Sequence, residues 1–186
     1  IADFNRDGKE DIYFTGNVVN NKLYLNEGDF IFNDVSSISQ TECKGSWSMG
    51  VSVIDINNDN LDDLFFTGNM TDNKLFLNKG NLKFDDISIE SGVSGDNRWY
   101  TGSTMIDINN DGFLDIYVSV AGLDGVKNNE LYVNNKDNTF TEMAKEYGID
   151  DIGNSVQATF FDYDKDGDLD LYVANYPMTP FDAPRS

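Results

Sequence analysis

Short apolar runs rich in β-branched and aromatic residues, separated by polar turns rich in Asn, Asp and Gly, extend along almost the whole chain. Runs of this length with β-branched and aromatic residues predict strands, and Asn, Asp and Gly are the residues that hairpin turns require. Helical periodicity is nearly absent. Residues 141–147 could form one helical turn, but the counterpart segments at Asp34 and Asp86 do not favour one. The pattern therefore predicts an all-β fold.

The predicted strands recur in units of about 52 residues. Each unit contains an acidic nine-residue loop followed by three strands, and a fourth strand leads into the next loop. The loops start at positions 3, 55, 107 and 162, so their starts are 52, 52 and 55 residues apart. The predicted strands cover residues 12–14, 22–26, 30–35, 47–54, 64–66, 74–78, 82–87, 99–106, 116–118, 130–134, 139–143, 155–161 and 171–173.

Four-stranded antiparallel units of this length are typical of β-propeller blades, because one small sheet cannot bury both faces without neighbours. The 186 residues make about 3.6 units, whereas closed propellers typically need about 4 to 8 blades. We therefore predict an open arc of a larger propeller, with three, four, four and two strands in its successive blades. Residues 1–176 form this segment, and the Pro-rich residues 177–186 form a connector or tail. A chain that starts at Ile1 without Met is expected to belong to a longer protein, which supplies the remaining blades.

The four acidic loops share the pattern Asp-x-Asn/Asp-x-Asp-Gly-x-x-Asp, which is typical of calcium loops. Ca²⁺ prefers six to eight hard oxygen ligands at about 2.3–2.6 Å, and such a loop offers side chains at positions 1, 3, 5 and 9 and a backbone carbonyl at position 7. Position 6 needs a left-handed conformation, which Gly adopts freely and Asn60 adopts at modest cost. We predict up to four Ca²⁺ ions, with weaker binding at the second loop. The predicted ligands are Asp3, Asn5, Asp7, Lys9, Asp11, Asp55, Asn57, Asp59, Leu61, Asp63, Asp107, Asn109, Asp111, Phe113, Asp115, Asp162, Asp164, Asp166, Asp168 and Asp170.

Other interpretations of the loops fit the sequence less well. Metal-free surface turns have no reason to keep three or four acids in the same register four times. An EF-hand needs a Glu at position 12 and a following helix, whereas strands follow here. The residues at position 12 are Phe14, Phe66, Val118 and Val173. Dockerin-type loops also lead into helices, and magnesium keeps several waters and is disfavoured in an all-protein cage.

Composition excludes several classes of function. The chain has no His, which removes imidazole acid/base chemistry and the commonest zinc sites. Its 33 acidic against 13 basic residues give a net charge of -20, which argues against a nucleic acid partner. Cys43 cannot form an internal disulfide and is expected to be a small buried apolar residue. No apolar run approaches the length of a transmembrane segment, and no signal segment opens the chain.

The four loops, the stretch 160–175 and the segment 138–149 resemble the FG-GAP/VCBS repeat family. More narrowly, they resemble the bacterial relatives of the ASPIC/UnbV, or cartilage acidic protein, group. The resemblance covers essentially the whole chain and implies a β-propeller with calcium loops in its hairpins, as in the integrin α-subunit head. It also implies an extracellular, cell-surface or periplasmic location. Asn60 departs from the pattern, because it replaces the loop Gly.

We expect a non-catalytic module, held rigid by calcium, that recognises or adheres to a carbohydrate or protein ligand. Trp47 and Trp99 lie eight residues before Asp55 and Asp107, where packing between blades is favoured over contact with a ligand. One alternative is a calcium-stabilised part of a polysaccharide lyase or hydrolase, for which the segment 98–100 is the one suggestive cluster. Another alternative is a purely structural spacer that associates through its open blade edges.

Overall fold

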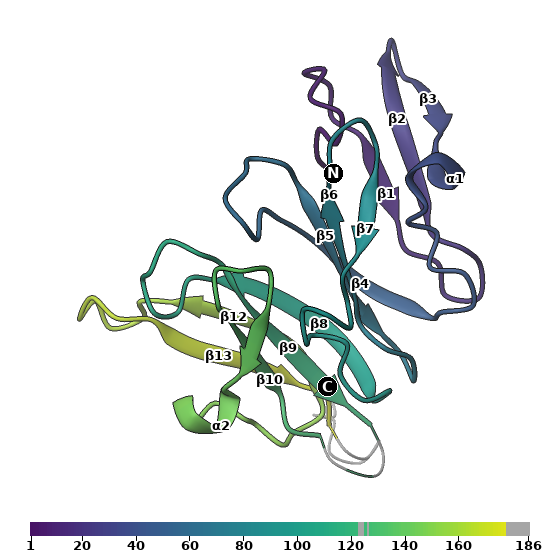
Figure 1. Cartoon of the computed structure of the whole chain (residues 1–186). Helices are drawn as coiled ribbons and strands as arrows, with labels where there is room; N and C mark the ends of the chain where they lie inside the picture. The colour runs from purple at the N-terminus through teal and green to yellow at the C-terminus, as the bar shows by residue number, and fades with distance from the viewer. Residues whose placement is uncertain (123–124, 126, 178–186) are drawn as a thin grey trace, which may run out of the picture.

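The computed structural model of the chain describes residues 1–122, 125 and 127–177 and has a nearly all-β fold. Four antiparallel sheets follow one another along the chain and lie side by side without closing into a ring (Figure 1). They contain three, four, four and two strands, as predicted. In chain order the sheets are named blades 1 to 4.

Blades 2 and 3 are four-stranded meanders in which each strand pairs with the next in sequence. Blade 2 consists of β4 (Ser48–Ile54), β5 (Asp63–Gly68), β6 (Lys74–Asn78) and β7 (Phe84–Asp86). Blade 3 consists of β8 (Trp99–Ile106), β9 (Asp115–Ala121), β10 (Glu130–Asn134) and β11 (Phe140–Glu142). Connections of this kind need only short turns, which the Asn-, Asp- and Gly-rich segments provide.

Blades 1 and 4 contain part of the same pattern. Blade 1 consists of β1 (Ile12–Phe14), β2 (Lys22–Gly28) and β3 (Ile31–Asp34). Blade 4 consists of β12 (Ser155–Phe161) and β13 (Asp170–Asn175). All predicted strands are present, and their ends differ from the predicted ends by no more than three residues.

Two single-turn helices follow the last strands of blades 1 and 3. The first is α1 (Ser36–Ser39), and the second is α2 (Ala144–Tyr147), which lies where the sequence allowed one turn. The prediction that the segment after Asp34 does not favour a helix is wrong. The Asp34 carboxylate accepts hydrogen bonds from the Ser36 N–H at 3.0 Å and from the Ser36 hydroxyl at 2.5 Å. Asp86 and Ser88 make the matching bonds in blade 2, where only turns follow, so these bonds alone do not make a helix. In α1 the Gln40 N–H also donates to the Ser36 carbonyl at 3.1 Å, whereas the matching Gly92 N–H donates to the Ile89 carbonyl.

Buried apolar side chains fill the spaces between neighbouring blades. Every residue of β5 is buried, and β9 is buried over six of its seven residues. Tyr13 of blade 1 packs on Phe66 of blade 2 with 5.1 Å between ring centroids, and Tyr117 of blade 3 packs on Phe160 of blade 4 at 5.5 Å. Each blade therefore depends on its neighbours to cover its apolar faces, as expected for a repeat fold.

The first strands of blades 2, 3 and 4 contact one another through small polar side chains. The Ser52 and Ser103 hydroxyls are 2.8 Å apart, and the Thr104 hydroxyl donates to the Ala158 carbonyl at 2.6 Å. Gly102 allows this close approach, because a Cβ there would lie 2.7 Å from the Val156 carbonyl oxygen. The polar side chains thus align successive blades at the strands that begin them.

Apart from Pro177, the predicted connector 177–186 lies outside the described residues. Within the described ranges, no helix is long and apolar enough to cross a membrane.

Candidate metal centre

The acidic loops occupy the same place in every blade. Residues 55–63 join β4 to β5, residues 107–115 join β8 to β9, and residues 162–170 join β12 to β13. Residues 3–11 precede β1 in the same way. Because the blades repeat, each set of five predicted ligand residues lies within one nine-residue turn. Among the described residues, however, the position 9 carboxylate joins no group of three acidic side chains whose oxygens lie within 4.8 Å of one another.

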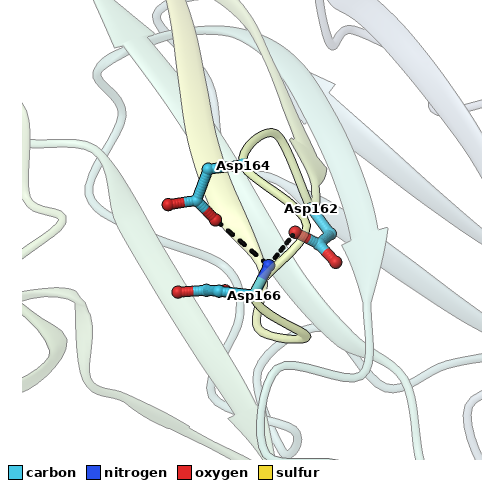
Figure 2. A group of neighbouring side chains, drawn as sticks. All are labelled: Asp162, Asp164 and Asp166. Carbon is cyan, nitrogen blue, oxygen red and sulfur yellow. Dashed lines mark hydrogen bonds between the residues drawn. The ribbon is translucent and has the colours of Figure 1, made fainter.

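All four loops contain the same hydrogen bonds between side chains and backbone. In the fourth loop the Asp166 N–H donates to the carboxylates of Asp162 at 3.1 Å and Asp164 at 3.2 Å, as Figure 2 shows. The Gly167 N–H donates to the second oxygen of Asp162, and the Asp168 N–H donates to Asp166. The first, second and third loops repeat these bonds at 2.8 to 3.1 Å. The oxygens of positions 1, 3 and 5 therefore converge in each loop.

Position 6 adopts the left-handed conformation in every loop. Gly8, Gly112 and Gly167 have φ of 84°, 87° and 98°, and Asn60 has φ of 64°. The expectation that Asn60 can take the place of Gly is therefore confirmed for the backbone. Asn is one of the few residues that tolerates this region.

The fourth loop has the greatest concentration of acid. Ligand oxygens of Asp162, Asp164 and Asp166 lie within 4.8 Å of one another, and no other group of three acidic, His or Cys residues in the described part of the chain is as close. The other loops carry Asn at position 3 instead. The backbone N–H of Asp168 holds the pKa of the Asp166 carboxyl below its usual value, so this group is ionised at neutral pH. The donor set is thus all oxygen and anionic, which fits Ca²⁺.

The acid at position 9 also anchors the fold. Asp63 is fully buried and accepts hydrogen bonds from the Ile56 N–H at 3.0 Å and from the Asn78 N–H at 2.7 Å. Asp11 and Asp115 make the matching pairs of bonds. Burial raises the pKa of Asp63 to about 7. The sequence predicted a metal ligand at position 9 but not these hydrogen bonds to the backbone. An Asn recurs in the strand that donates to each of these Asp residues, at Asn26, Asn78 and Asn134, and this repetition could have indicated the contact.

Neighbouring loops are in contact through position 4. The Arg6 guanidinium donates to the Asn60 carbonyl, and the Asn58 side chain donates to the Gly112 carbonyl at 2.9 Å. In both cases the acceptor is position 6 of the next loop. The first three loops therefore form a connected row.

A family model for the FG-GAP-like repeat matches residues 3–66, 55–118 and 119–173. The first two matched segments begin at the first Asp of an acidic loop. The chain belongs to the FG-GAP-like repeat family. A comparison with curated proteins finds no match.

In this FG-GAP-like repeat chain the two Trp residues are partly exposed. The exposed fractions are 38% for Trp47 and 39% for Trp99. Their backbones flank Asn69, whose N–H donates to the Trp47 carbonyl at 2.8 Å and which forms a β-bridge with Trp99. Strands in a sheet lie about 4.8 Å apart, so the two Trp backbones are about 10 Å apart. Each Trp side chain is therefore partly buried by the protein and partly exposed to solvent.

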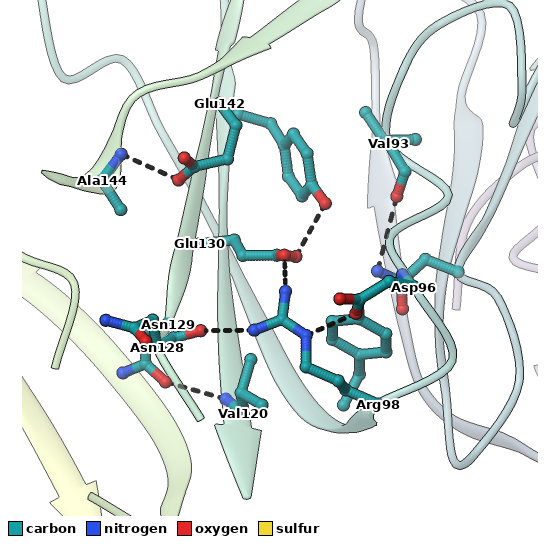
Figure 3. A network of polar contacts seen from close by, with 12 residues as sticks. Val93, Asp96, Arg98, Val120, Asn128, Asn129, Glu130, Glu142 and Ala144 are labelled. Atoms are coloured by element: carbon teal, nitrogen blue, oxygen red, sulfur yellow. Dashed lines mark hydrogen bonds and ion pairs between the residues drawn. The ribbon is translucent and has the colours of Figure 1, made fainter. Parts of the chain in front are cut away.

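The repeat fold engages Arg98 and Tyr100 in a polar network that reaches from the buried Tyr100 to Asp96, whose side chain is 65% exposed (Figure 3). The Arg98 guanidinium pairs with Glu130 and with Asp96, the latter at 2.5 Å, and donates to the Asn128 carbonyl at 3.1 Å. Tyr100 is fully buried, and its hydroxyl donates to Asp96 at 2.8 Å. Burial raises the pKa of Tyr100 to about 12. Both side chains are thus held by hydrogen bonds and ion pairs in and directly before blade 3.

Two further features carry no predicted site residue. Cys43 is partly buried beside the core of blades 1 and 2, and burial raises the pKa of its thiol to about 11, so the thiol is not activated. An open hollow of about 440 Å³ beside β13 is lined by Gly148, Ile149, Asp150, Asp151, Ile152, Leu171 and Val173.

Proposed function

We propose that the chain is a calcium-stabilised, non-catalytic recognition module that binds a carbohydrate or protein ligand outside the cytoplasm, at a cell surface, in the periplasm or in the extracellular space. The observation that carries the proposal is the repetition of one hydrogen-bonded arrangement of acidic oxygens in all four loops. Independent surface turns would not keep this arrangement. Membership of the FG-GAP-like repeat family adds support.

The side chains at positions 1, 3, 5 and 9 and the carbonyl at position 7 would hold the ion. In the fourth loop these are the oxygens of Asp162, Asp164, Asp166, Asp168 and Asp170. Bound Ca²⁺ supplies positive charge to carboxylates that otherwise repel one another within a single turn. Calcium modules outside cells bind in the range of about 0.1–1 mM, so such loops would be filled there.

We propose Trp47 and Trp99 as the contact residues of the recognition surface. Two indoles of almost equal exposure, on either side of one backbone position, offer a rigid apolar surface for a ligand. The net charge of -20 favours a neutral glycan or a basic protein over an anionic polymer. Within the family, we propose closest kinship with the bacterial ASPIC/UnbV group.

An enzymatic role is the weaker candidate. The suggestive cluster was Arg98 with Tyr100, and both side chains are held in the network of blade 3. The proposal of a non-catalytic module predicts no turnover of acidic or neutral polysaccharides. Calcium-dependent depolymerisation that is lost in Arg98→Ala would support the lyase or hydrolase alternative instead.

The proposal is tested by thermal unfolding of the chain in millimolar Ca²⁺, in millimolar Mg²⁺ and in EDTA. The number of bound metal ions per chain is then measured. We expect Ca²⁺, but not Mg²⁺, to raise the melting temperature, since metal at ten times its dissociation constant adds about 1.4 kcal/mol per site. Asp162→Asn should reduce the shift, whereas Asp85→Asn, an exposed Asp of β7 outside every loop, should not. Fewer than two bound ions would overturn the proposal.

A further inference from the structure

In two of the four acidic loops a Lys ammonium pairs with a predicted ligand carboxylate. The Lys9 ammonium lies 3.2 Å from the Asp7 carboxylate, and the Lys136 ammonium lies 3.3 Å from the Asp111 carboxylate. Both carboxylates occupy position 5 of their loops. Lys9 belongs to the first loop itself, whereas Lys136 reaches the third loop from the turn between β10 and β11.

Lys136 is held in place by a second contact. Its ammonium lies 5.4 Å from the ring centroid of Phe113, the residue at position 7 of the third loop. A cation over an aromatic face is attracted by the ring. The Lys136 backbone is also fixed, because its N–H donates to the Asn134 side chain at 2.8 Å. In blades 1 and 2 the matching turn residues are Gly28 and Gly80, which carry no charge.

In the second and fourth loops no Lys or Arg of the described residues pairs with the position 5 carboxylate. The fourth loop contains Lys165 at position 4, but the position 5 carboxylate there, Asp166, forms no ion pair with it. Asp59 at position 5 of the second loop instead accepts a hydrogen bond from the Asn57 amide at 3.1 Å. In the described ranges, neither Asp59 nor Asp166 forms an ion pair with a Lys or Arg. The fourth loop also has a third carboxylate, Asp164, within ligand distance of its neighbours. The four loops therefore differ in whether a Lys pairs with the position 5 carboxylate, although their backbones are alike.

We propose that Lys9 and Lys136 are internal counter-ions with which calcium must compete, so that the loops fill in a graded order with the fourth loop first. The inference rests on the proposed calcium function and assigns a role to residues outside the ligand set. An ammonium that is paired with the position 5 carboxylate occupies oxygens that Ca²⁺ needs as ligands. Its positive charge also repels the divalent ion. Lys136 and Lys9 are partly exposed, with side-chain exposures of 47% and 42%, so the effect on affinity is moderate.

The test is a Ca²⁺ titration of the full ¹⁵N-labelled chain, followed by amide NMR. The N–H groups of Gly8, Asn60, Gly112 and Gly167 each donate to the position 1 carboxylate of their own loop, so each signal reports one site. We expect the Gly167 signal to change at the lowest calcium concentration. Lys136→Gln should lower the calcium concentration at which the Gly112 signal is half changed by about two- to fivefold. The corresponding concentration for the Gly167 signal should stay almost unchanged.

Three variants separate this role from general electrostatics. Lys145→Gln makes the same change in net charge on the exposed face of α2, away from all loops, and should not shift Gly112 selectively. Lys136→Arg keeps the cation and should retain the wild-type midpoint. Phe113→Leu removes the ring under Lys136 and should give a smaller decrease than Lys136→Gln.

Two results would overturn the inference while the proposed function stands. One is that all four signals change together, and the other is that Lys136→Gln moves Gly112 no more than Lys145→Gln does. If no loop signal responds to Ca²⁺ at all, the calcium function itself is wrong, and the inference fails with it. Unchanged amide signals elsewhere in each variant establish that it folds.

Discussion

Arg98, which directly precedes β8, pairs with Glu130 at the start of β10 in blade 3 (Figure 3). The positions that match Glu130 in the first two repeats are Lys22 and Lys74, which pair with Asp34 and Asp86 at 2.7 and 3.1 Å. In the third repeat this Lys is replaced by an acid, and the cation comes instead from the residue that directly precedes β8 of the same blade. The exchange ties the segment that enters blade 3 to β10 with a nearly buried charge.

Arg98→Met should destabilise the fold strongly. The Glu130 side chain is only 10% exposed, so loss of Arg98 leaves a buried carboxylate without its cation, and removing one partner of such a pair costs about 3–5 kcal/mol. The double variant Arg98→Met with Glu130→Gln should recover much of that loss, because no unpaired charge remains. Urea unfolding of the two single variants and the double variant measures the coupling. Additive effects would contradict a direct pairing.

Glu142→Asp should cost about 1 kcal/mol of stability. One Glu142 oxygen accepts hydrogen bonds from the Leu131 N–H at 3.3 Å and the Ala144 N–H at 2.9 Å. In blade 1 two residues share this task, since Asp34 accepts from the Ser36 N–H and the Ser36 hydroxyl accepts from the Leu23 N–H at 3.0 Å. The shorter Asp leaves the Leu131 N–H without its acceptor.

Adding Ala144→Ser to Glu142→Asp recreates the Asp-x-Ser pattern of blade 1 and should restore stability. Ala144→Ser alone places a hydroxyl in a buried position beside the longer Glu142 and should destabilise the fold. Thermal unfolding of the four chains of this cycle provides the measurement. A double variant less stable than both single variants would rule out the exchange.

Asp34 should stabilise the fold at neutral pH and lose that contribution in acid. The Lys22 ammonium and the Ser36 donors lower the pKa of the Asp34 carboxyl from its usual 3.8 to about 2. Between these values the unfolded chain binds more protons than the folded chain, so the contribution is complete above about pH 4 and falls as the pH drops towards 2. Asp34→Asn should therefore lower the urea midpoint near pH 7 more than near pH 2. Asp29→Asn, in the turn between β2 and β3, is the charge-matched control.

Gly102→Ala should disturb the contact between blades 3 and 4. A Cβ at this position would lie 1.9 Å from the Gln157 side-chain oxygen and 2.7 Å from the Val156 carbonyl oxygen, and the backbone atom cannot move aside easily. Overpacking of this kind costs about 1–3 kcal/mol. Gly50→Ala is the matched control, because its Cβ would lie 3.1 Å from the nearest atom. Equal melting temperatures for the two variants would contradict this view of the blade contact.

The strands and the acidic loops could be predicted from sequence because both depend on local patterns. Short runs of β-branched and aromatic residues identified the strands, and the loop pattern placed Asn60 in a left-handed conformation. The helix α1 was missed, because it depends on one backbone hydrogen bond, from the Gln40 N–H to the Ser36 carbonyl, that the matching segment of blade 2 does not make. The roles of Arg98 and Lys136 were missed for another reason. Their partners, Glu130 and Asp111, lie 32 and 25 positions away, and only the pairing of the strands of blade 3 brings each pair together.

The agreement between loops also limits how such a chain can change during evolution. Deleting residues 55–106 would join Ile54 directly to Asp107, and the spliced loop would keep the hydrogen bonds that both parent loops share. Blade 1 would then face blade 3, where Val118 takes the place of Phe66 against Tyr13. The smaller side chain leaves a cavity. Recombination between two acidic loops can therefore remove or exchange a whole repeat without loss of the loop structure. Whether the new neighbour packs well against blade 1 depends on the residue that it places against Tyr13.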